Sequence, residues 1–184
     1  MVKLNQIPNI LTLSRILAAP IWMLAFYFNY YYFCILIIIY CAISDYLDGW
    51  FARKMKHTSI IGESLDPIAD KIFLAVVLIS YVSDNRANFI FVSLIIIREI
   101  VVSSLREILS KYNKSEKLKV SYLAKIKTCF QFLTILILGC VPLSTSLAAE
   151  TQFYGQIILY ITTFITIFTG YKYVIISIVE LKKI

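Results

Sequence analysis

The chain has 184 residues, of which 60% are hydrophobic, a formal charge of +7 and a mean hydropathy of +0.80. These values exclude a soluble domain of average composition and indicate an integral membrane protein, with one domain over residues 1–184 and no nucleic-acid partner. The four cysteines form no C-x-x-C pair and lie in apolar runs, so we expect small buried side chains rather than disulfides or a zinc site.

Six apolar stretches are long enough for transmembrane helices, so the predicted fold is an all-α, polytopic membrane protein. They cover approximately residues 10–28, 31–55, 65–82, 88–109, 124–143 and 152–179. Before the first stretch, Pro8 and Asn9 indicate a break and a helix cap. Residues 1–9 fit a short interfacial helix and a frayed chain end equally well.

The placement of charge predicts the orientation in the membrane. With six spans, Lys and Arg residues near the start, around residues 53–71 and 98–127, and near the end all fall towards one side, whereas Arg86 falls on the other with Asp84 and Glu150. The positive-inside rule then makes both termini cytoplasmic.

Four carboxylates stand out in this apolar chain. Asp45 and Asp48 are three residues apart and Asp66 and Asp70 are four apart, so on helices each pair shares a face. Structural helix-end carboxylates, an interpretation that suits Glu63, fit Asp45 and Asp48 poorly because these directly follow an apolar run. Four converging acids repel one another unless cations neutralise them, and Mg²⁺ prefers carboxylate oxygens shared with substrate phosphates. We therefore expect two divalent metals and a phosphate-bearing substrate at the cytoplasmic edge, with Mg²⁺ favoured and Mn²⁺ also suitable.

Small residues accompany these acids. Gly49 and Gly62 are the only glycines before residue 139, and Ala52 keeps the same helix face small. Close approach of a ligand explains this pattern, and helix packing explains each glycine taken alone. Arg53 supplies a forked cation suited to a pyrophosphate, although a snorkelling arginine at the membrane edge is an alternative.

This run resembles the signature of the CDP-alcohol phosphotransferases, D-x2-D-G-x2-A-R-x8-G-x3-D-x3-D, and matches it at every fixed position over residues 45–70. The resemblance implies a six-helix membrane enzyme, commonly a homodimer, that transfers a substituted phosphate from a CDP-linked donor to an alcohol and releases CMP. It implies that Asp45, Asp48, Asp66 and Asp70 hold two metals and that Asp70 is also the general base. It further implies that the nucleotide and diphosphate site is lined by Gly49, Ala52, Arg53 and Gly62.

A second cluster bears on the acceptor. Arg98 and Arg106 are eight residues apart, so a helix places them on roughly the same side, two turns apart. Arginines within a span need a phosphate, a carboxylate or water, which leaves anion binding and pairing with Glu99, Glu107 or the motif aspartates as alternatives.

The sequence around these arginines, the Asn9 to Arg15 segment and Lys125-Ile-Lys127-Thr128 resemble the bacterial phosphatidylglycerophosphate synthases, a branch of the same family. The resemblance implies CDP-diacylglycerol as donor and sn-glycerol 3-phosphate as acceptor, in the bacterial inner membrane. Arg98, Arg106 and Lys125 become the predicted acceptor-phosphate ligands. Lys119 and Lys127 are candidates for anionic lipid headgroups, and the single histidine, His57, is expected to be a solvated loop residue.

Two rival functions are open at this point. The same chemistry with another acceptor (phosphatidylglycerol, serine or an inositol phosphate) keeps the acidic motif, but an acceptor without a phosphate does not need Arg98 and Arg106. A divalent-cation channel or carrier explains the acids but not Gly49, Ala52 and Arg53. A channel also requires polar groups through several spans, whereas most charges here gather towards one edge.

Overall fold

The computed structural model describes residues 7–55, 60–112, 122–143 and 147–181, and the side chains within them except at 7–11, 46, 48–55, 60–67 and 122–125. These residues form six α-helices and one 3₁₀ turn, with no strand among them. The all-α prediction is therefore confirmed. The helices are α1 (Ile7–Tyr27), α2 (Tyr31–Met55), α3 (Ile60–Ser83), α4 (Phe89–Lys111), α5 (Tyr122–Cys140) and α6 (Ala148–Leu181), with the turn η3 (Val141–Leu143) after α5.

Two predicted helix starts differ from the observed ones. The break expected at Pro8 and Asn9 was wrong, because α1 begins at Ile7 and runs through both residues. Proline is tolerated in the first turn of a helix, where its missing N–H has no partner to lose. α3 begins at Ile60 rather than at residue 65, so Gly62 is helical as well as Asp66. The other boundaries agree with the expected ones to within a few residues.

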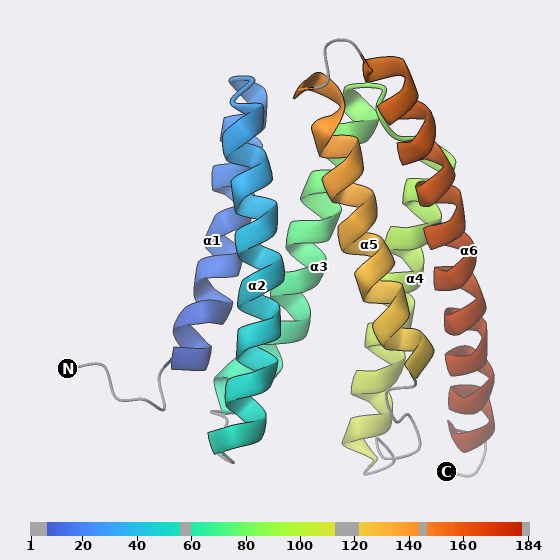
Figure 1. Ribbon diagram of the computed structural model, residues 1–184. Coiled ribbons are helices and arrows are strands. Elements are labelled where there is room, and N and C mark those ends of the chain that lie inside the picture. Colours follow the sequence, from blue (N-terminus) through green and yellow to red (C-terminus); the bar gives the residue numbers. More distant parts are fainter. Residues whose placement is uncertain (1–6, 56–59, 113–121, 144–146, 182–184) are drawn as a thin grey trace.

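The helices form an up-and-down bundle in which α1 begins and α6 ends at the same end (Figure 1). We call this the terminal end. α1 packs against α2 and α3, and α6 packs against α4 and α5, while contacts of α2 with α5 and of α3 with α4 and α5 join these two groups. Because short antiparallel connections alternate between the two ends, residues from the start of α5 and the end of α4 come together near the terminal end.

The main apolar core occupies the half of the bundle away from the terminal end. Trp22 is fully buried, and its indole Nε1 donates to the carbonyl of Cys34 at 3.1 Å. Tyr81 packs edge-on against Trp22 and donates to the carbonyl of Ile135 at 2.8 Å. An aromatic pair of this geometry contributes about 0.5–1.5 kcal/mol beyond its area burial. A smaller core cluster of Val102, Leu109 and Tyr173 lies towards the terminal end.

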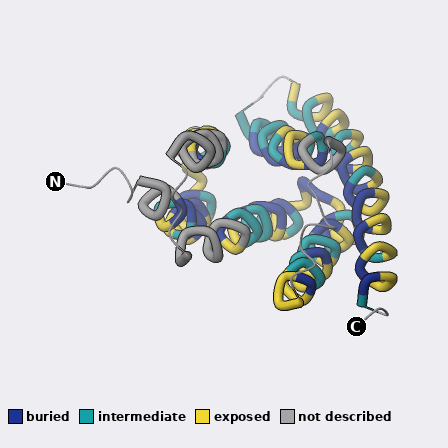
Figure 2. The backbone as a smooth tube through the Cα atoms, turned by 90° about the horizontal axis from the view of Figure 1, so that it is seen from below, coloured by how far each residue is buried: buried dark blue, intermediate teal, exposed yellow. Residues whose placement is uncertain are grey.

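The outer surface of the bundle is apolar. Large hydrophobic side chains such as Leu17 (54% exposed), Leu24 (55%) and Phe164 (73%) face outward, and Figure 2 shows the buried residues on the inner sides of the helices. An amphipathic helix in water has polar and charged residues on its outer face instead. Cys129 also faces outward and Cys140 is only partly buried, so the prediction that every cysteine is buried was wrong for these two.

Two described helical segments are long and apolar enough to cross a membrane by length and composition, Ile126–Leu143 and Ala148–Leu181. The apolar parts of α1 and α2, Thr12–Tyr27 and Tyr31–Asp45, are shorter.

Candidate functional site

Arg15 of α1 joins two of the signature aspartates. Its side chain is 2% exposed, and its Nη1 donates to Oδ1 of Asp45 on α2 at 3.2 Å and to Oδ1 of Asp70 on α3. Both carboxylates are close to half exposed. Three helices thus bring Asp45 and Asp70, which are 25 residues apart in the chain, to a single cation.

This arrangement fits the hard divalent ions that the sequence predicts. Two carboxylates that share one cation, with accessible oxygens, form the donor set that Mg²⁺ prefers. α2 and α3 are continuous through Asp48 and Asp66, which is the conformation that the three- and four-residue spacings require. Their side chains lie outside the described residues, within which no cluster of three His, Cys, Asp or Glu residues forms. The two-metal site stays a prediction.

The predicted nucleotide residues are also placed by backbone alone. Gly49, Ala52 and Arg53 lie in α2 and Gly62 lies in α3, each in the part whose side chains are not described. The same holds for Lys125 in α5. His57 and Lys119 lie outside the described residues altogether, so the expectations for them stay predictions.

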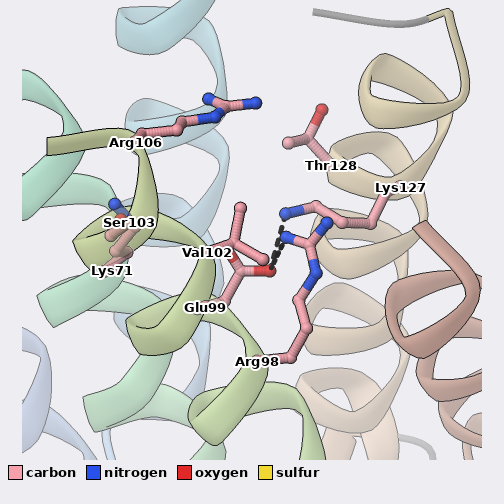
Figure 3. A pocket seen from close by; sticks show the side chains of 8 residues that line it. All are labelled: Lys71, Arg98, Glu99, Val102, Ser103, Arg106, Lys127 and Thr128. Carbon is pink, nitrogen blue, oxygen red and sulfur yellow. Dashed lines mark hydrogen bonds and ion pairs between the residues drawn. The ribbon is translucent and has the colours of Figure 1, made fainter. Parts of the chain in front are cut away.

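A cavity of about 140 Å³ opens between α3, α4 and α5 (Figure 3). Positions 98, 99, 102, 103 and 106 of α4 line it, which is the spacing of a single helix face. α3 contributes one residue and α5 two. The complete lining is Lys71, Arg98, Glu99, Val102, Ser103, Arg106, Lys127 and Thr128. Four cations and one carboxylate leave a formal excess of three positive charges, so the cavity is suited to an anion.

Glu99 is the centre of a hydrogen-bond network in this cavity. Its Oε1 accepts from Lys127 Nζ at 2.6 Å, from Gln131 Nε2 at 3.0 Å and from Arg98 Nη1 at 3.2 Å. Figure 3 shows Arg98 and Lys127 converging on this carboxylate from α4 and α5. Because a buried charge is costly unless it is paired and hydrogen-bonded, the network fixes these side chains relative to one another.

The prediction that Arg98 and Arg106 share a side of their helix is confirmed, since both line the cavity. Arg98 also pairs with Glu99 at 3.2 Å, so carboxylate pairing is confirmed for this residue, while anion binding stays a prediction. Arg106 differs from Arg98, because no carboxylate among the described residues forms an ion pair with it. It lies instead over the ring of Tyr173, with its Cζ 4.8 Å from the ring centroid.

Two lysines in the cavity were not predicted as ligands. Lys127 was a candidate for contact with lipid headgroups, but its side chain is 8% exposed and its ammonium is paired with Glu99, which contradicts that role. Lys71 follows Asp70 directly and lines the cavity. The sequence feature that could have indicated these lysines is their position near predicted site residues: Lys71 lies one position beyond a signature aspartate, and Lys127 lies two beyond Lys125. Register alone does not say which neighbouring helix a side chain faces.

The sequence is similar to a known protein family over most of its length. The sequence profile described as CDP-alcohol phosphatidyltransferase matches residues 5–168. The chain belongs to this family. It is 40% identical over 174 residues to the CDP-diacylglycerol–glycerol-3-phosphate 3-phosphatidyltransferase of Rickettsia felis, covering 92% of this chain and 93% of the relative. Proteins of the same name from Blochmanniella floridana (39%; 92% and 89% covered) and Pectobacterium atrosepticum (32%; 91% and 92% covered) are similar to it over nearly their whole length.

Within this phosphatidyltransferase, the two parts of the site meet on α3. Asp70 binds Arg15 on one side, and the next residue, Lys71, lines the cationic cavity. Successive residues of an α-helix point about 100° apart, so α3 separates an acidic region from a basic one by a single residue step. Asp70 and the cationic cavity therefore adjoin the same turn of α3.

Proposed function

We propose that the chain transfers the phosphatidyl group of CDP-diacylglycerol to sn-glycerol 3-phosphate, giving phosphatidylglycerol phosphate and CMP. The observation that carries this proposal is the cationic cavity beside Asp70, with Lys71, Arg98, Arg106 and Lys127 around a single carboxylate. The names of the relatives agree with both substrates. An acceptor without a phosphate gives no reason for four cations around so small a space.

The volume of the cavity supports a small anion rather than the lipid. Sites for drug-sized ligands measure roughly 300–1,000 Å³, and this cavity measures about 140 Å³. The phosphate of the acceptor fits such a space, while the two acyl chains of the donor belong on the apolar exterior. Separate places for the two substrates are what a reaction between a lipid and a soluble metabolite requires.

In the proposed reaction, the primary hydroxyl of glycerol 3-phosphate attacks the lipid-bearing phosphorus. A new P–O bond forms, the bond to the CMP oxygen breaks, and the carboxylate of Asp70 takes the proton of the hydroxyl. Arg98 and Arg106 hold the acceptor phosphate through charge-assisted hydrogen bonds. Arg15 orients Asp70 by its ion pair, and orientation of this kind supplies a large part of the rate.

The residues proposed to hold two Mg²⁺ ions are Asp45, Asp48, Asp66 and Asp70. When bound, such ions neutralise the charge of the diphosphate and of the departing CMP. Gly49, Ala52, Arg53 and Gly62 are proposed to contact the nucleotide and the diphosphate, because they lie on the same two helix segments as the aspartates.

We also propose that all six helices span the bacterial inner membrane, with both termini and the active site on the cytoplasmic side. The outward-facing apolar side chains support contact with acyl chains. The cavity cations lie towards the terminal end, as the positive-inside rule requires for a cytoplasmic end. A homodimer is part of this proposal and rests on the family resemblance.

The test is CMP release by the purified protein in detergent with CDP-diacylglycerol and Mg²⁺. Glycerol 3-phosphate, phosphatidylglycerol, serine and an inositol phosphate are supplied in parallel. We expect release with glycerol 3-phosphate alone. Release with another acceptor instead would keep the chemistry and reject the assignment of the cavity, and release with none would reject the activity.

A further inference from the structure

The face of α6 that packs against α4 and α5 is built mainly from small and hydroxyl-bearing residues. Its buried positions recur every three or four residues, as one helix face requires. Small residues allow neighbouring helices to approach closely. Among the buried positions of the described part of α6, Tyr173 is the single aromatic residue, so its presence calls for a separate explanation. The small and hydroxyl-bearing ones include Thr162, Thr163, Thr166, Thr169, Gly170 and Ser177.

Tyr173 lies against both arginines of the cavity. The Cζ atoms of Arg106 and Arg98 are 4.8 Å and 5.9 Å from the centroid of its ring. The tyrosine is 5% exposed, and a guanidinium over a desolvated aromatic ring is attracted more strongly than one at an exposed site. Since the two arginines are two helical turns apart on α4, one ring that contacts both limits the distance between their guanidinium groups.

The neighbours of Tyr173 on α6 shape the path of Arg98. A Cβ atom added at Gly170 would lie 2.7 Å from Cγ and 2.9 Å from Nε of Arg98, so the arginine stem crosses α6 where there is no side chain. Thr169 Oγ1 accepts from Arg98 Nη2 at 3.0 Å. α6 therefore surrounds Arg98 in three ways: Gly170 leaves room for its stem, Thr169 accepts a hydrogen bond from it, and Tyr173 lies against its guanidinium.

We propose that Tyr173, together with Gly170, positions Arg98 and Arg106 for the acceptor phosphate. This inference rests on the proposed function. An aromatic face orients a guanidinium without neutralising it, whereas a carboxylate partner competes with the phosphate for the same charge. Glu99 already forms ion pairs with Arg98 and Lys127, so it competes with a phosphate for these two cations. The ring holds Arg106 without a carboxylate partner among the described residues, which makes Tyr173 a determinant of specificity for a phosphorylated acceptor.

The experiment measures KM for glycerol 3-phosphate, KM for CDP-diacylglycerol and kcat in Tyr173→Leu and Tyr173→Phe. We expect Tyr173→Leu to raise KM for glycerol 3-phosphate about five- to tenfold through loss of two ring contacts. Its kcat at saturating acceptor and its KM for the lipid should stay close to the wild-type values. Tyr173→Phe should behave like wild type, because the buried hydroxyl has no hydrogen-bond partner among the described residues.

Two matched controls separate positioning from general packing. Tyr171→Leu removes a tyrosine two residues away that is 64% exposed, and it should leave both KM values unchanged. Gly170→Ala should raise KM for glycerol 3-phosphate by displacing Arg98. Gly155→Ala creates a contact as close, 2.5 Å from Leu138 Cδ2, but away from the cavity, and should lower thermal stability without changing KM.

The outcomes are distinct. An unchanged KM for glycerol 3-phosphate in Tyr173→Leu, or an equal rise for both substrates, overturns the positioning role while wild-type activity still supports the proposed function. Wild-type protein that releases no CMP with glycerol 3-phosphate overturns the proposed function itself, and the inference with it. If Tyr173→Leu does not fold, Tyr173→Met removes the aromatic face and still fills the space, and the same comparison of KM values decides the question.

Discussion

The ammonium of Lys127 lies 2.6 Å from Oε1 of Glu99, and this ion pair ties α5 to α4 at the cationic cavity. Both side chains are about nine-tenths buried, with exposed fractions of 8% and 12%. A pair in this position is compensated only while both partners are present, since removing one leaves the other charge desolvated. The Glu99 carboxylate therefore stabilises the fold by compensating the charges of the cations buried around it.

Glu99→Ala should lower the stability of the fold markedly. Loss of one partner of a buried ion pair typically costs about 3–5 kcal/mol, and three donors lose their acceptor here. The measurement is the thermal unfolding midpoint in detergent. Glu107→Ala is the matched control, because its pair with Lys111 is exposed and of the i,i+4 type, worth about 0.3–0.5 kcal/mol. Equal losses of stability in the two variants would contradict the role given to Glu99.

Arg106→Ala should raise KM for glycerol 3-phosphate by roughly ten- to a hundredfold, the equivalent of one charge-assisted hydrogen bond of about 1.5–3 kcal/mol. KM for CDP-diacylglycerol should change little. Arg98→Ala should shift the acceptor KM in the same direction and also cost stability, because Arg98 contacts Glu99 and Thr169 as well. Steady-state kinetics with each substrate varied in turn provides the check. Parallel changes in both KM values would contradict the assignment of the two arginines to the acceptor site.

Inorganic phosphate should inhibit competitively against glycerol 3-phosphate and not against CDP-diacylglycerol. The cavity carries an excess of three positive charges and its volume of about 140 Å³ suits a small anion. The inhibition constant should weaken in Arg106→Ala, which loses one of the four cations. Inhibition of the same strength in that variant would mean that phosphate binds elsewhere.

Asp70→Asn should abolish CMP release while membrane insertion and folding survive, because the amide cannot take a proton from the acceptor hydroxyl. Chelation of divalent ions should abolish the wild-type activity, and added Mg²⁺ should restore it. The control is Asp84→Asn at the opposite end of the bundle, where the carboxylate pairs with Arg86; its kcat should match that of the wild type. CMP release by Asp70→Asn at the wild-type rate would exclude the proposed base.

The membrane topology can be tested with single cysteines in a background in which the four natural ones are replaced. Glu150→Cys lies near the start of α6, and Lys111→Cys lies at the last residue of α4, on opposite ends of the bundle. A membrane-impermeant maleimide added to spheroplasts should label Glu150→Cys alone. Labelling of Lys111→Cys without lysis would reverse the proposed orientation, and labelling of both would contradict an intact six-span bundle.

The sequence by itself determined the helical architecture and the helical spacing of the acidic motif. Six apolar runs of about the length of a membrane-spanning helix favour helices, because each helix pairs its backbone groups within its own segment. The spacings of Asp45 to Asp48 and of Asp66 to Asp70 follow the helical period, which is a property of local geometry. The same period predicts that Arg98 and Arg106 share one side of α4, whatever packs against it, and both line the cavity.

The start of α1 and the state of Cys129 show where local patterns failed. Pro8 breaks a helix in its interior but not in its first turn, and the sequence does not say which turn it occupies. Cys129 lies in an apolar run, and in a bundle with an apolar exterior such a run does not distinguish the inner face from the outer one.

Only the tertiary structure decided which charges meet. Arg15, Asp45 and Asp70 come from three helices, and Lys71, Glu99, Lys127 and Tyr173 come from four. Each helix presents its own face by local rules, but the rotation of every helix against its neighbours follows from packing of the whole bundle. Lys127 could therefore be placed on a helix from the sequence, whereas its contact with Glu99 rather than with lipid depends on how α5 packs against the rest.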